Sequence, residues 1–185
     1  VTGCNGQLGN EMQLLAAGHP EFNYFFTDVK ELDITDEKAV KSFVGMHEID
    51  CIVNCAAYTA VDKAESDEAF CDLLNHTAPG YLAKAVHERG GCMIQVSTDY
   101  VFDGTAHIPY PASVVIRTAW LYSTFGNNFV KTMLRLGREK ESLGVIFDQI
   151  GTPTYARDLA VAIFAVLTQD FVPGIYHFSN EGAIS

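Results

Sequence analysis

Three glycines near the N-terminus are spaced so that they could hold a phosphate. Gly3, Gly6 and Gly9 recur at three-residue spacing in the segment TGCNGQLG, and an amphipathic helical pattern follows directly. Glycines permit a tight turn and a close approach of the backbone, and the first turn of a helix offers free N–H groups and positive dipole. A glycine turn before a helix can also be no more than a turn. Pyrophosphate binding here is therefore a hypothesis that needs support from elsewhere in the chain.

Asp28 supplies that support through its position. It lies 19 residues after Gly9, at the end of a predicted strand. An acidic side chain at this point of a βαβ unit binds the adenosine ribose of a dinucleotide. The spacing therefore predicts NAD(H) or NADP(H) as cofactor. Asp28 favours NAD, whereas the neighbouring Lys30 could accept a 2′-phosphate, so both cofactors remain open.

Two further segments could line the same site. Asp33 and Ile34 stand before a predicted helix, where they could hold an adenine or simply begin the helix. The residues at 53–58 end a predicted strand in small side chains. Small residues there let a ligand approach the backbone at the edge of the sheet, although packing alone could also require them.

Polar side chains also close two later predicted strands. STDYVFDG at 97–104 brings a hydroxyl, a carboxylate and a phenol together, among them Thr98 and Asp99. RTAWLY at 117–122 contains the chain's one tryptophan, Trp120, which could form a platform for a sugar or a base. Turn formation and core packing are the competing explanations. Since the carboxyl ends of parallel strands form the crevice of a doubly wound sheet, we expect both segments at the site.

The elements that must position these residues alternate between strands and helices. This order, with strands that read as continuous apolar runs, predicts an α/β fold with a doubly wound, Rossmann-like parallel sheet. Strands are predicted at 24–26, 51–54, 93–97, 114–118, 143–147 and 175–178. Helices are predicted at 8–17, 36–46, 66–89 (two helices), 127–139 and 156–168.

The composition suits a chain that buries a substantial core. Of its 185 residues 48% are hydrophobic, and the net charge of −11 argues against nucleic acid or an anionic membrane surface as a partner. The longest apolar run is too short to span a bilayer and there is no signal-peptide pattern, so we expect a cytoplasmic protein. The five cysteines lack metal-ligand spacing. We expect them to be reduced, and we expect no metal site.

One junction breaks the rule for parallel strands. The runs at 93–102 and 114–118 both read as buried parallel strands, and the eleven residues between them include a glycine and two prolines. A parallel connection needs a crossover of a dozen or more residues, usually a helix. Either the second strand is not parallel to the first, or a segment is missing near 110–113. We expect a missing segment.

These motifs together resemble the extended short-chain dehydrogenase/reductases, and within them the branch of dTDP-4-dehydrorhamnose reductases. The resemblance runs nearly end to end in the family's order. The matching motifs are TGCNGQLG at 2–9, NCAAYTAVDKAE at 54–65, STDYVFDG at 97–104, RTAWLY at 117–122, NNFVKTML at 127–134, DQIGTPTYARDLA at 148–160 and GIYHFSNEG at 174–182.

The resemblance implies that NAD(P)H reduces the C4 ketone of dTDP-4-dehydro-L-rhamnose to give dTDP-L-rhamnose, a precursor of cell-surface polysaccharide. It implies a dinucleotide-binding domain at 1–121 and part of a substrate domain at 122–185, with the helix at 156–168 packed back on the first domain. It also implies a nucleotide-sugar substrate and allows for a homodimer.

Site residues carry over by motif. The cofactor would meet Gly3, Gly6, Gln7, Leu8, Gly9, Asp28, Asp33, Ile34, Ala56, Ala57 and Tyr58. Thr98 resembles the family's catalytic hydroxyl, which donates a hydrogen bond to the ketone oxygen. With Thr98, the residues Asp99 and Trp120 would contact the substrate.

One departure from the family is serious. Its catalytic Tyr-x-x-x-Lys is absent, because no tyrosine here is followed by lysine four positions on. In the family this pair lies on a helix between the STDYVFDG and RTAW strands, the same interval that is too short for a crossover. If the pair is truly absent, the alternative is a non-catalytic NAD(P)-binding regulatory subunit. A third hypothesis is an epimerase or reductase that acts on another nucleotide sugar.

Overall fold

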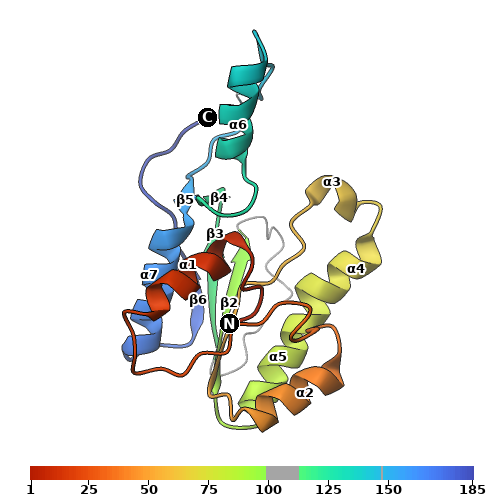
Figure 1. The fold of residues 1–185 in the computed structure, drawn as a ribbon, viewed down its shortest axis with the longest axis vertical. Coiled ribbons are helices and arrows are strands. Elements are labelled where there is room, and N and C mark those ends of the chain that lie inside the picture. The colour runs from red at the N-terminus through yellow and green to blue at the C-terminus, as the bar shows by residue number, and fades with distance from the viewer. Residues whose placement is uncertain (99–112, 147) are drawn as a thin grey trace.

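A parallel sheet forms the centre of the molecule (Figure 1). The structure is a computed structural model that describes residues 1–98, 113–146 and 148–185. Four strands lie in the order β1-β2-β3-β6, and all neighbours are parallel. Their bounds are β1 Cys51–Asn54, β2 Cys92–Thr98, β3 Ser113–Thr118 and β6 Gly174–His177. The predicted α/β fold with a doubly wound parallel sheet is confirmed.

Single bridges widen this sheet beyond β1. Thr2 pairs with Asn54 on one side and with Thr27 on the other, both in parallel. The segment before the glycine turn therefore lies between β1 and the segment that ends in Thr27. This arrangement brings the start of the chain to the carboxyl edge of the sheet.

Helices cover both faces of the sheet. On one face α2 (Glu37–Met46) packs with α5 (Ala78–His87), and on the other α1 (Gln7–Ala16) packs with α7 (Ala156–Thr168). The neighbouring β2 residues Met93 and Ile94 show the two layers. Because side chains alternate along a strand, Met93 enters the α2–α5 core and Ile94 the α1–α7 core.

The segment predicted as two helices at 66–89 is one helical run with a change of pitch. It begins with α4 (Glu68–Asp72), widens into the π-helical turn η1 (Leu73–Thr77) and continues as α5. A four-residue helix, α3 (Val61–Ala64), precedes it. Such π turns often occur at functional sites.

The C-terminal third adds a small second sheet and a projecting helix. The strands β4 (Leu121–Tyr122) and β5 (Thr154–Tyr155) pair in parallel. Between them α6 (Phe129–Glu139) extends away from the main sheet, and none of its residues is buried in the described part of the chain (Figure 1).

Two predicted strands are wrong. The segment 24–26 is not a strand: Thr27 alone pairs, with Thr2, and in this parallel register only Val1 lies opposite any residue of 24–26. Residues 143–146 form no strand either. The side chains of Val145 and Ile146 are 51% and 67% exposed, so their apolar pattern reflects no buried sheet position. Phe147 lies outside the described residues.

The strands on either side of the short junction are parallel. The register runs from Met93 opposite Ser113 to Thr98 opposite Thr118. The alternative that the second strand runs the other way is therefore wrong. The connection itself, 99–112, lies outside the described residues.

A buried acidic side chain joins α1 to the turn after β4. Glu11 on α1 is 1% exposed, and its Oε1 accepts a hydrogen bond of 2.7 Å from the hydroxyl of Ser123, which follows β4. Its other oxygen lies 3.8 Å from Nε of Arg157 on α7. Because a buried carboxylate without a donor is costly, Ser123 is required for this junction.

We predict that Ser123→Ala lowers the free energy of unfolding by about 1–3 kcal/mol, because it removes the close donor of Glu11. Thr124→Ala, at the exposed neighbouring position, is the matched control and changes the free energy by less than about 0.5 kcal/mol. Urea unfolding followed by circular dichroism measures both. Equal losses in the two variants would contradict the role given to Ser123.

Candidate active site

The glycine turn packs tightly against the end of β1. Gly3 has φ +62°, and a Cβ there would lie 2.7 Å from the backbone of Ala56. A Cβ on Gly9 would lie 2.5 Å from Cα of Cys4. Both positions therefore require glycine, the first for its backbone conformation and both for close packing.

Gly6 is placed differently. It is the N-cap of α1 and forms no side-chain cap, and a Cβ on it would meet Gly3 O alone, at 3.2 Å. Its open side lies at the start of a helix, where unpaired N–H groups and the helix dipole favour an anion. The turn thus fits a pyrophosphate, with Gln7 and Leu8 as the first residues of the helix.

Asp28 lies beside this turn, as the spacing predicts for a ribose ligand. Its carboxylate accepts hydrogen bonds from the backbone N–H groups of Asn5, at 3.1 Å, and Val29, at 2.8 Å. The first of these bonds ties the acid to the glycine turn itself. Lys30 is exposed on the same loop.

The adenine segment divides into a surface residue and a core residue. Asp33 is exposed and accepts bonds from the N–H and the hydroxyl of Thr35, at 2.9 and 2.6 Å. These two bonds hold the pKa of the Asp33 carboxyl below its usual range. Ile34 is 6% exposed and belongs to the α2–α5 core, so its side chain mainly supports the segment.

The end of β1 is fixed by amide side chains that the sequence reasoning missed. Asn54 is fully buried, and its Oδ1 accepts from the hydroxyl of Thr2 and from N–H of Ala56, while its Nδ2 donates to Gln95. The relevant signal was present, since a polar residue closes an otherwise apolar strand. Beyond Asn54, burial raises the pKa of the Cys55 thiol to about 12. Ala57, two residues further on, is exposed.

Asn75 holds the next part of this loop and was also missed. From the π turn it accepts a bond of 2.7 Å from N–H of Tyr58 and donates one of 3.0 Å to the carbonyl of the same residue. The side chain therefore replaces a strand partner for Tyr58. The contact joins residues 17 positions apart, and no local pattern indicates it.

Thr98 and Trp120 lie at the carboxyl ends of neighbouring strands. Thr98 is the exposed last residue of β2 and pairs with Thr118 in β3. Trp120 follows β3 with φ +47°, and a Cβ on Gly151 would lie 2.5 Å from its ring. Its carbonyl accepts a bond of 3.2 Å from N–H of Thr154. Asp99 lies outside the described residues.

A further charged group occupies this edge of the sheet. Arg117 pairs with Ser97 on one side and His177 on the other. Its Nε is buried and has no hydrogen-bond partner among the described residues. A buried donor of this kind indicates that an acceptor belongs beside it.

A glycine turn at a helix start, an acid beside it and polar strand ends at one edge of a parallel sheet define a class. The chain has the Rossmann-like NAD(P)-binding fold of the extended short-chain dehydrogenase/reductases.

Comparisons with known proteins give the family. The model of the RmlD substrate binding domain matches residues 1–113 and 110–185. A dTDP-4-dehydrorhamnose reductase from Aggregatibacter actinomycetemcomitans is 35% identical over 217 residues, covering 100% of this chain and 74% of the relative. A probable dTDP-4,6-dihydroxy-2-methyloxan-3-one 4-ketoreductase from Streptomyces antibioticus is 38% identical, covering 99% of this chain and 71% of the relative.

A solved structure agrees in fold. The dTDP-4-dehydrorhamnose reductase of Bacillus anthracis in complex with NADP has a TM-score of 0.90 and 36% identity, covering 100% of this chain and 75% of that one. The chain belongs to the RmlD family, the dTDP-4-dehydrorhamnose reductases, which are NAD(P)-dependent nucleotide-sugar oxidoreductases.

The alignment is longer than the chain. It spans 217 positions with the Aggregatibacter protein, against 185 residues here, and the two parts of the family match meet at 110–113. Relatives therefore carry residues that have no counterpart in this sequence.

The described residues provide neither a metal-binding cluster nor a membrane-spanning helix. The described residues contain no group of three or more His, Cys, Asp or Glu side chains that could hold a metal ion. Within the same part of the chain, every helix is too short or too polar to cross a membrane.

We predict that Gly6→Ala weakens NADP⁺ binding by about tenfold or more, because the methyl group fills the open side of the turn. The fold should persist, since the backbone conformation suits alanine and Gly3 O can move slightly. Gly45→Ala is the control, because a Cβ there meets nothing within 4 Å. Titration calorimetry measures the affinity for NADP⁺, and thermal unfolding checks that each variant is folded. Unchanged affinity in Gly6→Ala would rule out binding at this turn.

Proposed function

We propose that this protein reduces the C4 ketone of dTDP-4-dehydro-L-rhamnose with NAD(P)H and so forms dTDP-L-rhamnose. The observation that carries the proposal is that Thr98 and Trp120 lie at the ends of neighbouring strands, at the sheet edge that also holds the glycine turn. A dinucleotide on that turn and a sugar at the strand ends would meet at this edge. The named activity of relatives 35–40% identical supports this substrate.

In this proposal each residue has a physical role. The turn at Gly6 and the carboxylate of Asp28 hold the pyrophosphate and the ribose, which directs the rest of the cofactor toward the strand ends. The bound cofactor supplies the hydride. Thr98 donates a hydrogen bond to the ketone oxygen, where negative charge develops. Trp120 offers a flat face to the sugar or the base.

The proton donor is not in this chain, and we place it in a segment between about Tyr110 and Ser113. Connections between parallel strands are right-handed, and the step from β2 to β3 continues the direction of the step from β1 to β2. A crossover helix would therefore lie on the same face as α5. A tyrosine on it would protonate the alkoxide, with a nearby lysine lowering its pKa.

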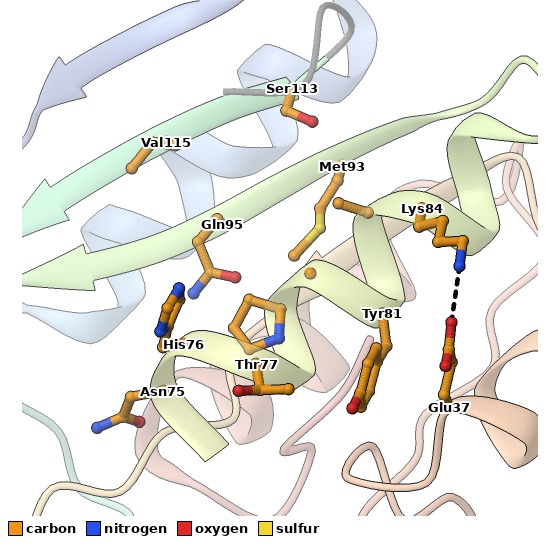
Figure 2. Close-up of a pocket in the computed structure, with 13 residues that line it drawn as sticks. Glu37, Asn75, His76, Thr77, Tyr81, Lys84, Met93, Gln95, Ser113 and Val115 are labelled. Carbon is orange, nitrogen blue, oxygen red and sulfur yellow. Dashed lines mark hydrogen bonds and ion pairs between the residues drawn. The ribbon is translucent and has the colours of Figure 1, made fainter. Parts of the chain in front are cut away.

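A groove on that face supports this placement. It has a volume of about 510 Å³ and lies between α5 and the sides of β2 and β3 that face it. Figure 2 shows Tyr81 of α5 on one side, and Met93 and Gln95 of β2 with Val115 of β3 along the sheet. Faces of a parallel sheet are normally covered by helices, so an open groove over β2 and β3 is the position expected for one.

We predict that the 185-residue chain binds NADPH but turns over dTDP-4-dehydrorhamnose at least about 100-fold more slowly than a repaired chain. The repaired chain carries the corresponding segment of the Aggregatibacter relative between Tyr110 and Ser113. The assay follows loss of NADPH absorbance. If the repaired chain binds NADPH but does not consume it with this sugar, the proposed reaction is wrong.

Thr98 can be tested in the same repaired chain. Thr98→Val should lower kcat by about 100-fold with little change in KM for NADPH, because it removes a bond that strengthens in the transition state. Thr168→Val, at the exposed end of α7, is the matched control and should leave kcat unchanged. Equal kcat values in the two variants would remove Thr98 from the reaction.

A non-catalytic NAD(P)-binding subunit is the second candidate, and the absence of Tyr-x-x-x-Lys favours it. Sequencing the source DNA across 110–113 separates the two. A gene that encodes Pro111 and Ser113 without an insert between them supports the subunit. An insert of about 30 residues that contains Tyr-x-x-x-Lys supports the reductase, and this length is close to the difference between the 217 aligned positions and the 185 residues of the chain. The name of the Streptomyces relative makes other dTDP-4-keto sugars necessary comparison substrates. An epimerase would consume no cofactor.

A further inference from the structure

The turn at 123–128 lies against the start of α1, next to the glycine turn. Gly126 has φ +59°, and a Cβ on it would lie 3.0 Å from Cγ of Gln7. Gln7 is the first residue of α1 and directly follows Gly6. The turn that leads into α6 therefore contacts the same helix start that fits the cofactor pyrophosphate.

Asn128 connects the two elements with every polar atom of its side chain. Its Nδ2 donates to Oε1 of Gln7 at 2.9 Å and to the carbonyl of Ser123 at 2.8 Å. Its Oδ1 accepts a bond of 3.0 Å from N–H of Lys131 and so caps α6. One side chain thus fixes the start of α6 and holds it to the start of α1.

A second contact one turn further along α1 supports the first. Gln7 and Glu11 are four positions apart and share one face of the helix. Glu11 accepts the hydroxyl hydrogen bond of Ser123, whose carbonyl is bound by Asn128. Two side chains of α1 therefore hold the same turn, at two points.

Apart from the contacts of Asn128, α6 has little support from the rest of the described structure. In the described part of the chain it buries no residue, and Lys131 binds carbonyls of its own turn, at Thr124 and Gly126. Its position relative to the cofactor turn therefore depends on the contacts that Asn128 and Ser123 make with α1.

We propose that Asn128 is a positioning residue that couples occupancy of the glycine turn to the placement of α6. The proposal rests on the dinucleotide site of the proposed function. A ligand that immobilises the turn also restrains Gln7, and Gln7 restrains α6 through Asn128. Ligand binding at the glycine turn then lowers the conformational entropy that is lost when α6 becomes ordered.

Asn128→Asp tests this coupling, because aspartate still caps α6 but cannot donate to Gln7 or Ser123. Asn127→Asp, at the exposed preceding position, carries the same charge and is the control. Hydrogen exchange by mass spectrometry is measured at α6 and at the first turn of α1, without ligand and with saturating NADP⁺. A circular dichroism melt of each variant confirms folding, and Gln7→Met provides a second variant that removes the acceptor.

Without ligand, we expect exchange at the first turn of α1 to be roughly fivefold faster in Asn128→Asp and unchanged in Asn127→Asp. With NADP⁺, exchange at α6 should slow in the wild type and in Asn127→Asp. In Asn128→Asp and Gln7→Met, α6 should lose this response. In Asn128→Asp the glycine turn should keep it.

Retention of the α6 response in Asn128→Asp would overturn the coupling. Unchanged exchange at α1 in that variant without ligand would overturn the positioning role itself. Failure of the wild type to bind NADP⁺ would contradict the proposed function and the coupling to it. The comparison without ligand would still decide whether Asn128 positions α6.

Discussion

The buried amide of Asn54 holds together the edge of the sheet at which the glycine turn and the ends of β1 and β2 lie. It binds the strand that leads into the glycine turn, the backbone just beyond β1, and Gln95 in β2. A buried amide group is costly without hydrogen-bond partners, so Asn54 holds these three segments at the positions where its bonds to them form. The glycine turn then packs closely against the backbone of Ala56.

That edge serves two regions of the chain that are far apart in sequence. α1 packs on α7 in the core and holds the turn before α6 through Gln7 and Glu11. The same helix therefore begins at the glycine turn and holds the turn before α6 along its flank. In such an arrangement the two turns share one helix, and their relative position does not depend on a flexible linker.

Local chemistry made much of this fold predictable. The bounds of α7, 156–168, follow directly from the sequence, because a continuous apolar stripe is bounded by polar residues. The spacing alone indicated that the glycine turn and Asp28 belong together, and the bond from N–H of Asn5 to the Asp28 carboxylate joins them. The strand predicted at 143–147 failed because an apolar run indicates burial only when a partner strand exists to cover it. The bond between Gln7 and Asn128 joins residues 121 positions apart, and no periodicity of either segment indicates it.

Trp120 adopts a left-handed backbone conformation that side chains other than glycine rarely tolerate. Such a residue is strained by roughly 1–2 kcal/mol, and here the bond from Thr154 and the contact of its ring with the backbone of Gly151 hold it in place. Any side chain at position 151 would displace the ring, and a smaller residue at 120 would leave Gly151 uncovered. A side chain at position 151 is therefore compatible with this backbone only when the residue at position 120 is smaller than tryptophan.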